Sequence, residues 1–180
     1  MIAFNRRLPY VNRNPLNIRY SNKVKWQGQE GQNKGFVVFN SFSMGYRAAV
    51  KILRSYHLRD VRSIGAIINT WAPPNENKTD QYIKNVVHFM NRLSNVNDTL
   101  RYDTQGEPCY DTEQSSYDTP SATKHLNLRN REEVVSLLLA MTKVEMGANT
   151  AQILSMREYA ELGFDMAVTA PGFFSPPSGK

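Results

Sequence analysis

The sequence is most distinctive over residues 14–48, which contain Asn14-Pro15-Leu16-Asn17-Ile18-Arg19-Tyr20, Trp26-Gln27-Gly28, Gly35-Phe36-Val37-Val38-Phe39 and Gly45-Tyr46-Arg47-Ala48. The part from Gly35 to Asn40 favours a strand, because aromatic and β-branched side chains are concentrated there. Lys23–Trp26 is a weaker strand candidate, so the two segments together predict a small hairpin. An amphipathic helix over about 44–58 follows, with Ser43 as its N-cap.

Two more helices are predicted in the first half of the chain. Ser63 is placed to cap a short helix that reaches Trp71, because Pro73-Pro74 cannot continue it. Thr79 opens the next helix. Its inward side chains recur at helical spacing and are Tyr82, Ile83, Val86, Met90 and Leu93.

The second half of the chain predicts two helices as well. Asn130 followed by Glu133 has the pattern of a capping box for a helix that runs to about Met146, with Gly147 at its end. Thr150 is the expected cap of a last helix, which Gly163 closes. The predicted fold class is therefore mainly α (α+β), with a small β-hairpin.

Length and composition favour one globular domain. The chain has 180 residues, of which 41% are hydrophobic, enough to bury a sizeable core. Residues 1–168 are predicted to form the domain, and the polar residues 97–124 form a long loop or insertion within it. Residues 169–180 hold three prolines and two glycines, which predicts a flexible tail.

The net charge of +6 is unevenly distributed, because residues 1–62 hold twelve Lys or Arg and two acids. Such a basic surface suits an anionic polymer, either nucleic acid or a bacterial envelope. Charge alone favours a solvated surface over either partner. No nucleic-acid-binding motif accompanies the charge, so no nucleic-acid partner is predicted.

Several classes of protein are not expected. Cys109 is the single cysteine, and His57, His88 and His125 lack ligand spacing, so neither a metal nor another cofactor is predicted. No apolar run is long enough to span a membrane. Residues 1–7 lack the apolar stretch of a secretory signal. If the target is a cell wall, we therefore expect another route: carriage in a virion, or synthesis in host cytoplasm followed by delivery to the periplasm and cell wall.

The ordered string over residues 14–48 resembles phage virion lysins and related peptidoglycan-degrading proteins of the lysozyme-like superfamily. In them an Asn-Asn-Pro-Gly-Asn-Ile-Arg element leads into Trp-x-Gly, Phe-x-x-Phe and a Gly-x-Arg-Ala helix. The resemblance continues over residues 71–83 and 137–147. It implies a lysozyme-like domain whose Glu-x-Gly helix follows the Asn-rich segment, as a circular permutation would produce. Leu16 replaces a glycine of the family pattern, and Met146 replaces a small or polar residue.

Glu145 is the predicted catalytic residue. It continues the apolar stripe of Val134, Leu138 and Met141, in the last turn of its helix. Burial and the helix dipole both raise a carboxyl pKa there, as a general acid at neutral pH requires. Spacing alone favours an ordinary glutamate whose side chain bends to solvent or pairs with Lys143 or Arg157. The resemblance favours the catalytic role.

A second set of residues is predicted to bind substrate. Trp71 and Tyr82 would stack on N-acetyl sugars, and Asn75 and Asn77 would bond their acetamido groups. The alternative is a helix stop and an Asx-rich loop with Trp71 in the core. Glu76 is a second catalytic candidate. Asn14, Asn17, Tyr20 and Trp26 complete the substrate-binding set. For Tyr20 and Trp26, packing in the core is the alternative.

These observations predict a phage lysin that cuts the MurNAc–GlcNAc β-1,4 bond of peptidoglycan, acting as a lytic transglycosylase through one glutamate. A lysozyme-type hydrolysis would need Glu76 as a second carboxylate. A peptide-cleaving lysin is an alternative, as is an inactive virion structural or wall-binding protein. The predicted partners are peptidoglycan and other virion proteins.

Overall fold

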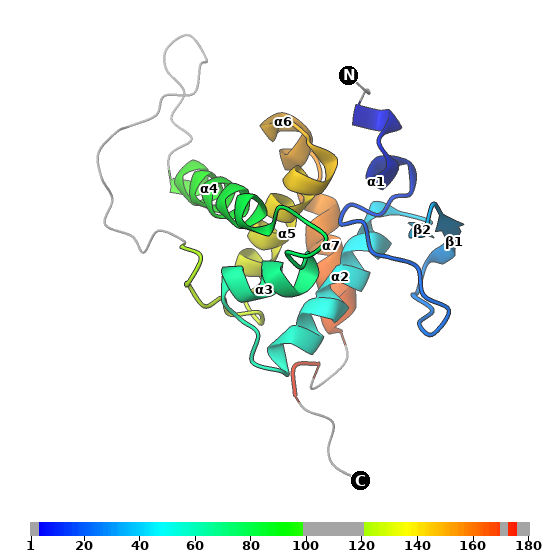
Figure 1. Ribbon diagram of the computed structural model, residues 1–180, viewed down its shortest axis with the longest axis horizontal. Helices are drawn as coiled ribbons and strands as arrows, with labels where there is room; N and C mark the ends of the chain where they lie inside the picture. The colour runs from blue at the N-terminus through cyan, green and yellow to red at the C-terminus, as the bar shows by residue number, and fades with distance from the viewer. Residues whose placement is uncertain (1–3, 99–120, 170–172, 176–180) are drawn as a thin grey trace.

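The computed structural model describes residues 4–98, 121–169 and 173–175. Its elements are η1 (Phe4–Arg6), α1 (Leu8–Val11), β1 (Gln29–Asn33), β2 (Phe36–Phe39), α2 (Phe42–His57), α3 (Ile64–Trp71), α4 (Thr79–Asp98), α5 (Arg131–Met146), α6 (Thr150–Leu154) and α7 (Arg157–Val168). The described chain is mainly helical with one two-stranded antiparallel sheet, which confirms the predicted α+β class (Figure 1).

Helix α5 forms the centre of the domain. Its residues from Leu137 to Thr142 are all fully buried, so the helix is covered on every side rather than along one stripe. Helix α4 packs on it from one side and α7 from another, and α2 lies along α7 (Figure 1). The buried Tyr46 hydroxyl on α2 lies 3.0 Å from Oγ1 of Thr142, which joins α2 to α5.

The sheet is a tight hairpin. Lys34 and Gly35 form its two-residue turn at φ 52° and 82°, the left-handed values that a type I′ turn requires, and Asn33 pairs with Phe36. The prediction of a first strand at Lys23–Trp26 is wrong. The first strand is Gln29–Asn33, whose polar residues have low β-propensity and are held by pairing with β2.

Several predicted helix ends are confirmed. Ser63 caps α3 by accepting a hydrogen bond from Ala66 N, and Asn130 caps α5 in the same way. Gly147 ends α5 in a left-handed conformation. The capping box is only half formed, because the Glu133 carboxylate accepts from Asn127 N.

Two predicted caps are wrong by one or two positions. Ser41, not Ser43, caps α2, and its hydroxyl accepts from Met44 N. Asn149, not Thr150, caps α6 and forms a complete capping box with Gln152.

The predicted last helix is two helices, and Gly163 lies inside α7 rather than at its end. A Cβ at Gly163 would lie 2.6 Å from Tyr46 Cβ and 2.9 Å from Ser43 O. The glycine is therefore needed for the close approach of α7 to α2, and α7 continues to Val168.

The two predicted irregular segments are only partly described. Of residues 97–124, those from 99 to 120, including Cys109, lie outside the described residues. Helix α7 ends at Val168. Part of the predicted tail contacts the domain, because Arg54 on α2 donates to Phe173 O and the Phe174 ring meets the His57 ring at 5.3 Å.

Candidate active site

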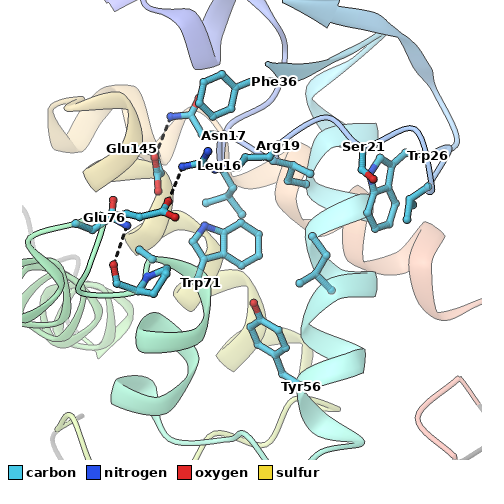
Figure 2. Close-up of a pocket in the computed structure, with 16 residues that line it drawn as sticks. Leu16, Asn17, Arg19, Ser21, Trp26, Phe36, Tyr56, Trp71, Glu76 and Glu145 are labelled. Carbon is cyan, nitrogen blue, oxygen red and sulfur yellow. Dashed lines mark hydrogen bonds and ion pairs between the residues drawn. The ribbon is translucent and has the colours of Figure 1, made fainter. Parts of the chain in front are cut away.

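A cavity of about 580 Å³ lies between the segment before β1, α2, the loop after α3 and the end of α5 (Figure 2). Its lining combines aromatic and apolar side chains with polar ones, and Glu76 and Glu145 lie at one end of it (Figure 2). Figure 2 shows the Trp71 ring between Tyr56 and the end that holds Glu76 and Glu145. The lining residues are Leu16, Asn17, Ile18, Arg19, Ser21, Val24, Trp26, Phe36, Ile52, Tyr56, Trp71, Ala72, Pro73, Glu76, Asn77 and Glu145.

Asn14 holds the loop that forms one wall of the cavity. Its side chain is fully buried, donates to Ile18 O and Val37 O, and accepts from Ile18 N, each at 2.9 Å. These bonds close the turn in which Asn17 has φ 49°. Asn14 is thus out of reach of a ligand, and the prediction that it contacts substrate does not fit its position. It positions Asn17 instead.

Glu145 is where three elements meet. Asn17 Nδ2 donates to its Oε2 at 2.9 Å, and the Tyr82 hydroxyl on α4 donates to its Oε1 at 2.9 Å. The carboxyl is half-buried and faces the cavity. It has neither of the alternative ion pairs, because Lys143 donates to Ala148 O and Arg157 pairs with Glu132 and Glu161.

Burial raises the pKa of Glu145, and the hydrogen bonds from Asn17 and Tyr82 partly oppose this rise. The pKa of Tyr82 is raised well above 10 by burial and by the neighbouring Glu145 charge, so the hydroxyl remains a donor. The carboxyl therefore retains a proton to higher pH than an exposed glutamate, and two donors stabilise it once the proton has left. Both properties suit a group that gives up a proton and later takes one back.

Glu76 has a different environment from Glu145. Its carboxylate forms an ion pair of 2.8 Å with Arg19, and both side chains are at least half exposed, so water screens the pair (Figure 2). Arg19 was not among the predicted site residues. The sequence signal that could have identified Arg19 as a site residue is its position in the Asn17-Ile18-Arg19 string.

The other predicted site residues divide into three groups. Trp26, Trp71 and Asn77 line the cavity. Tyr20 and Asn75 are exposed and are not part of the lining. Tyr82 is buried beneath Glu145, so it is placed to orient the acid and not to stack on a sugar as predicted.

Sequence reasoning also missed the apolar wall. Phe36 from β2, and Ile52 and Tyr56 from α2, face the cavity. Ile52 and Tyr56 lie four residues apart on the predicted helix stripe, and that spacing does not distinguish a cavity wall from the core.

Glu145 also lines a second cavity, of about 640 Å³. Its other lining residues are Arg6, Arg7, Leu8, Val11, Asn33 and Lys34. Arg7 additionally donates to Met146 O at the end of α5. Among the described residues, Glu145 is the one that lines both cavities, so it lies where they meet.

No group of three or more His, Cys, Asp or Glu in the described part of the chain is placed to hold a metal ion. Over the same ranges, no helix has both the length and the apolar character needed to cross a membrane.

Comparison with known proteins gives one informative similarity. No family model matches the chain. Over 82 residues it is 37% identical to Protein P5 of Pseudoalteromonas phage PM2, a match that covers 43% of this chain and 51% of Protein P5. The chain thus spans about half the length of that relative, and its similarity is to a bacteriophage protein.

Proposed function

We propose that this protein degrades peptidoglycan by cleaving the β-1,4 bond between N-acetylmuramic acid and N-acetylglucosamine, with Glu145 as the general acid. The observation that carries the proposal is the half-buried Glu145 carboxyl, with a pKa raised by burial, in a cavity lined by Trp26 and Trp71. A glycosidic oxygen leaves only when it is protonated as its bond breaks. Flat aromatic rings suit the C–H faces of sugars.

The sequence supports the same reaction. Residues 14–48, 71–83 and 137–147 resemble lysozyme-like phage lysins, and on that ground we propose a circularly permuted lysozyme-like domain. The similarity to a phage protein fits a phage lysin, carried in the virion or acting from the host cytoplasm at the cell wall. In this proposal Trp26, Trp71, Asn17 and Asn77 contact the glycan.

A lytic transglycosylase is the form of the reaction that the site favours. Glu145 gives its proton to the leaving oxygen as the bond to C1 of the muramyl residue breaks. The resulting carboxylate then takes the proton of the muramyl 6-hydroxyl, whose oxygen bonds to C1 and closes a 1,6-anhydro ring. The bonds from Asn17 and Tyr82 stabilise the carboxylate that the first step leaves. Glu76, paired with Arg19, is not required.

Digestion of purified peptidoglycan sacculi, followed by mass spectrometry of the released fragments, tests the proposal. Fragments ending in 1,6-anhydromuramic acid with the wild type, and none with Glu145→Gln, are expected. Reducing-end muramic acid would show hydrolysis and give Glu76 a catalytic role. New amino groups without new sugar ends would indicate a peptidase. Binding without any fragments would indicate a wall-binding protein.

A further inference from the structure

The cavity on the basic side of Glu145 has an unusual charge for a site that holds a catalytic acid. Arg6, Arg7 and Lys34 line it, and the acid among its described lining residues is Glu145 itself. The first cavity holds Arg19, but there the cation is paired with Glu76. The two cavities that meet at Glu145 therefore differ in character: one is aromatic and the other is cationic.

Two of these cations have no competing partner within the described residues. Neither the Arg6 guanidinium nor the Lys34 ammonium bonds to another described side chain or carbonyl, and both residues are exposed. Arg7 differs, because it donates to Met146 O and so helps to complete the end of the helix that carries Glu145. Arg6 and Lys34 are thus the groups that remain available to a ligand.

The backbone fixes where these two side chains begin. Lys34 is in the two-residue turn of the hairpin, held by the pairing of Asn33 with Phe36. Arg6 ends η1, with Arg7 between it and α1. The two cations come from segments far apart in the sequence, and the fold brings both to the lining of one cavity.

We propose that this basic cavity binds the carboxylates of the peptidoglycan stem peptide, next to the glycosidic bond that Glu145 protonates. The inference rests on the proposed function. A polymer that reacts at Glu145 has to extend to both sides of the acid, so part of it enters the cationic cavity. The stem peptide, attached to every uncleaved muramyl residue, carries free carboxylates. Leu8 and Val11 provide an apolar surface for its alanine methyl groups.

The alternative is general attraction of any polyanion to a protein with a net charge of +6. A specific subsite and general charge attraction predict different results when the same number of charges is removed elsewhere on the protein. Only general attraction predicts that binding weakens in that case. Arg6→Gln with Lys34→Asn removes two charges from the cavity, and asparagine tolerates the positive φ of residue 34. Lys84→Gln with Arg92→Gln removes two charges from exposed positions on α4 that line neither cavity.

The experiment compares intact sacculi with glycan strands whose stem peptides have been removed by an amidase. The half-saturating concentration of intact sacculi is expected to rise about fivefold in the cavity double variant, the scale of two lost solvent-exposed ion pairs. The maximal rate should stay unchanged, as for loss of uniform binding. Peptide-free strands and the α4 double variant should change less than about twofold.

Binding is measured separately by co-sedimentation in the Glu145→Gln background, with thermal unfolding of every variant as a folding check. If the double variant does not fold, the single variants Arg6→Gln and Lys34→Asn replace it. Each should lose part of the binding to intact sacculi. Selective loss of binding to intact sacculi supports the subsite even if the wild type cuts nothing, in which case the proposed function fails alone. If the cavity variants digest intact sacculi as well as the wild type does, the proposed subsite is wrong and the proposed function stands.

Three other results also overturn the subsite. Equal loss in the α4 variant would show general charge attraction. Equal loss on peptide-free strands would show that the cavity does not bind the peptide. Displacement from sacculi by a single-stranded oligonucleotide, lost in the cavity variant, would identify nucleic acid as the ligand.

Discussion

The Tyr82 hydroxyl donates a hydrogen bond of 2.9 Å to Oε1 of Glu145, across the packed faces of α4 and α5. The Tyr82 ring is only 7% exposed, so packing holds the donor in place. The packing of α4 against α5 therefore contributes to the pKa of the proposed catalytic acid, alongside burial and the hydrogen bond from Asn17.

Glu145→Gln is expected to reduce wall degradation by about 10²–10⁴-fold, the usual contribution of a general acid, because glutamine cannot supply a proton. Its amide oxygen can still accept from Tyr82 or Asn17, so the melting temperature should stay within a few degrees at neutral pH. Fragment release and thermal unfolding check both points. Full activity would remove Glu145 from the mechanism, whereas collapse of the fold would make it a structural carboxylate.

Tyr82→Phe is expected to shift the pH dependence of activity. The hydrogen bond from Tyr82 lowers the pKa of Glu145, so its removal should raise that pKa further above the ordinary glutamate value. Because the acid is active when protonated, the decline of kcat/KM at high pH should move to higher pH. Phenylalanine preserves the buried ring. A decline that stays in place, or moves to lower pH, contradicts the assignment.

The stability of the protein should also depend on the protonation of Glu145. Its pKa is raised in the folded state, so its contribution is fully present below the ordinary pKa of 4.5 and is lost as pH rises through the folded value. Glu145→Gln has no such titration. The melting temperature of the variant, relative to wild type, should therefore rise between pH 4 and pH 7.5. A constant difference would argue against the raised pKa.

Gly163→Ala is expected to destabilise the contact between α2 and α7. The new Cβ would lie 2.6 Å from Tyr46 Cβ and 2.9 Å from Ser43 O, which forces the helices apart. Overpacking of this kind costs about 1–3 kcal/mol, or about 2–12 °C in a chain of this size. Gly31→Ala in β1 is the matched control, because nothing lies within 4 Å of its Cβ position. Equal melting temperatures for the two variants would be evidence against a close helix contact.

Removal of residues 170–180 is expected to lower the melting temperature by about 2–8 °C, because partial burial of two phenylalanines contributes roughly 1–2 kcal/mol. Phe173 packs by Lys51 and Arg54, and Arg54 bonds Phe173 O. Removal of residues 176–180 alone keeps these contacts and serves as the control. If both truncated proteins have the melting temperature of the wild type, the contact of Phe173 with α2 contributes nothing to stability.

Local sequence determined much of the helical structure. Ser63, Asn130 and Gly147 act on backbone groups within a few residues of themselves, so their roles follow from short patterns. The same reasoning placed the strand near 36–39 and Glu145 at the end of a buried helix. Where two neighbouring polar residues were both suitable, as with Ser41 and Ser43, pattern alone did not choose between them. Ser43 is buried near Gly163 instead of capping α2.

Tertiary structure decided the remaining features, because they depend on contacts between segments far apart in the sequence. Tyr82 lies 63 residues from Glu145, and Asn17 lies 128 residues from it, so no local pattern relates either donor to the acid. Gly163 has the pattern of a helix end, and only the approach of α2 explains its position inside α7. Polar β1 is a strand because β2 supplies its partners. The sequence pointed to Glu145 as the candidate acid, and packing determined the hydrogen bonds of its carboxyl and the direction of its pKa shift.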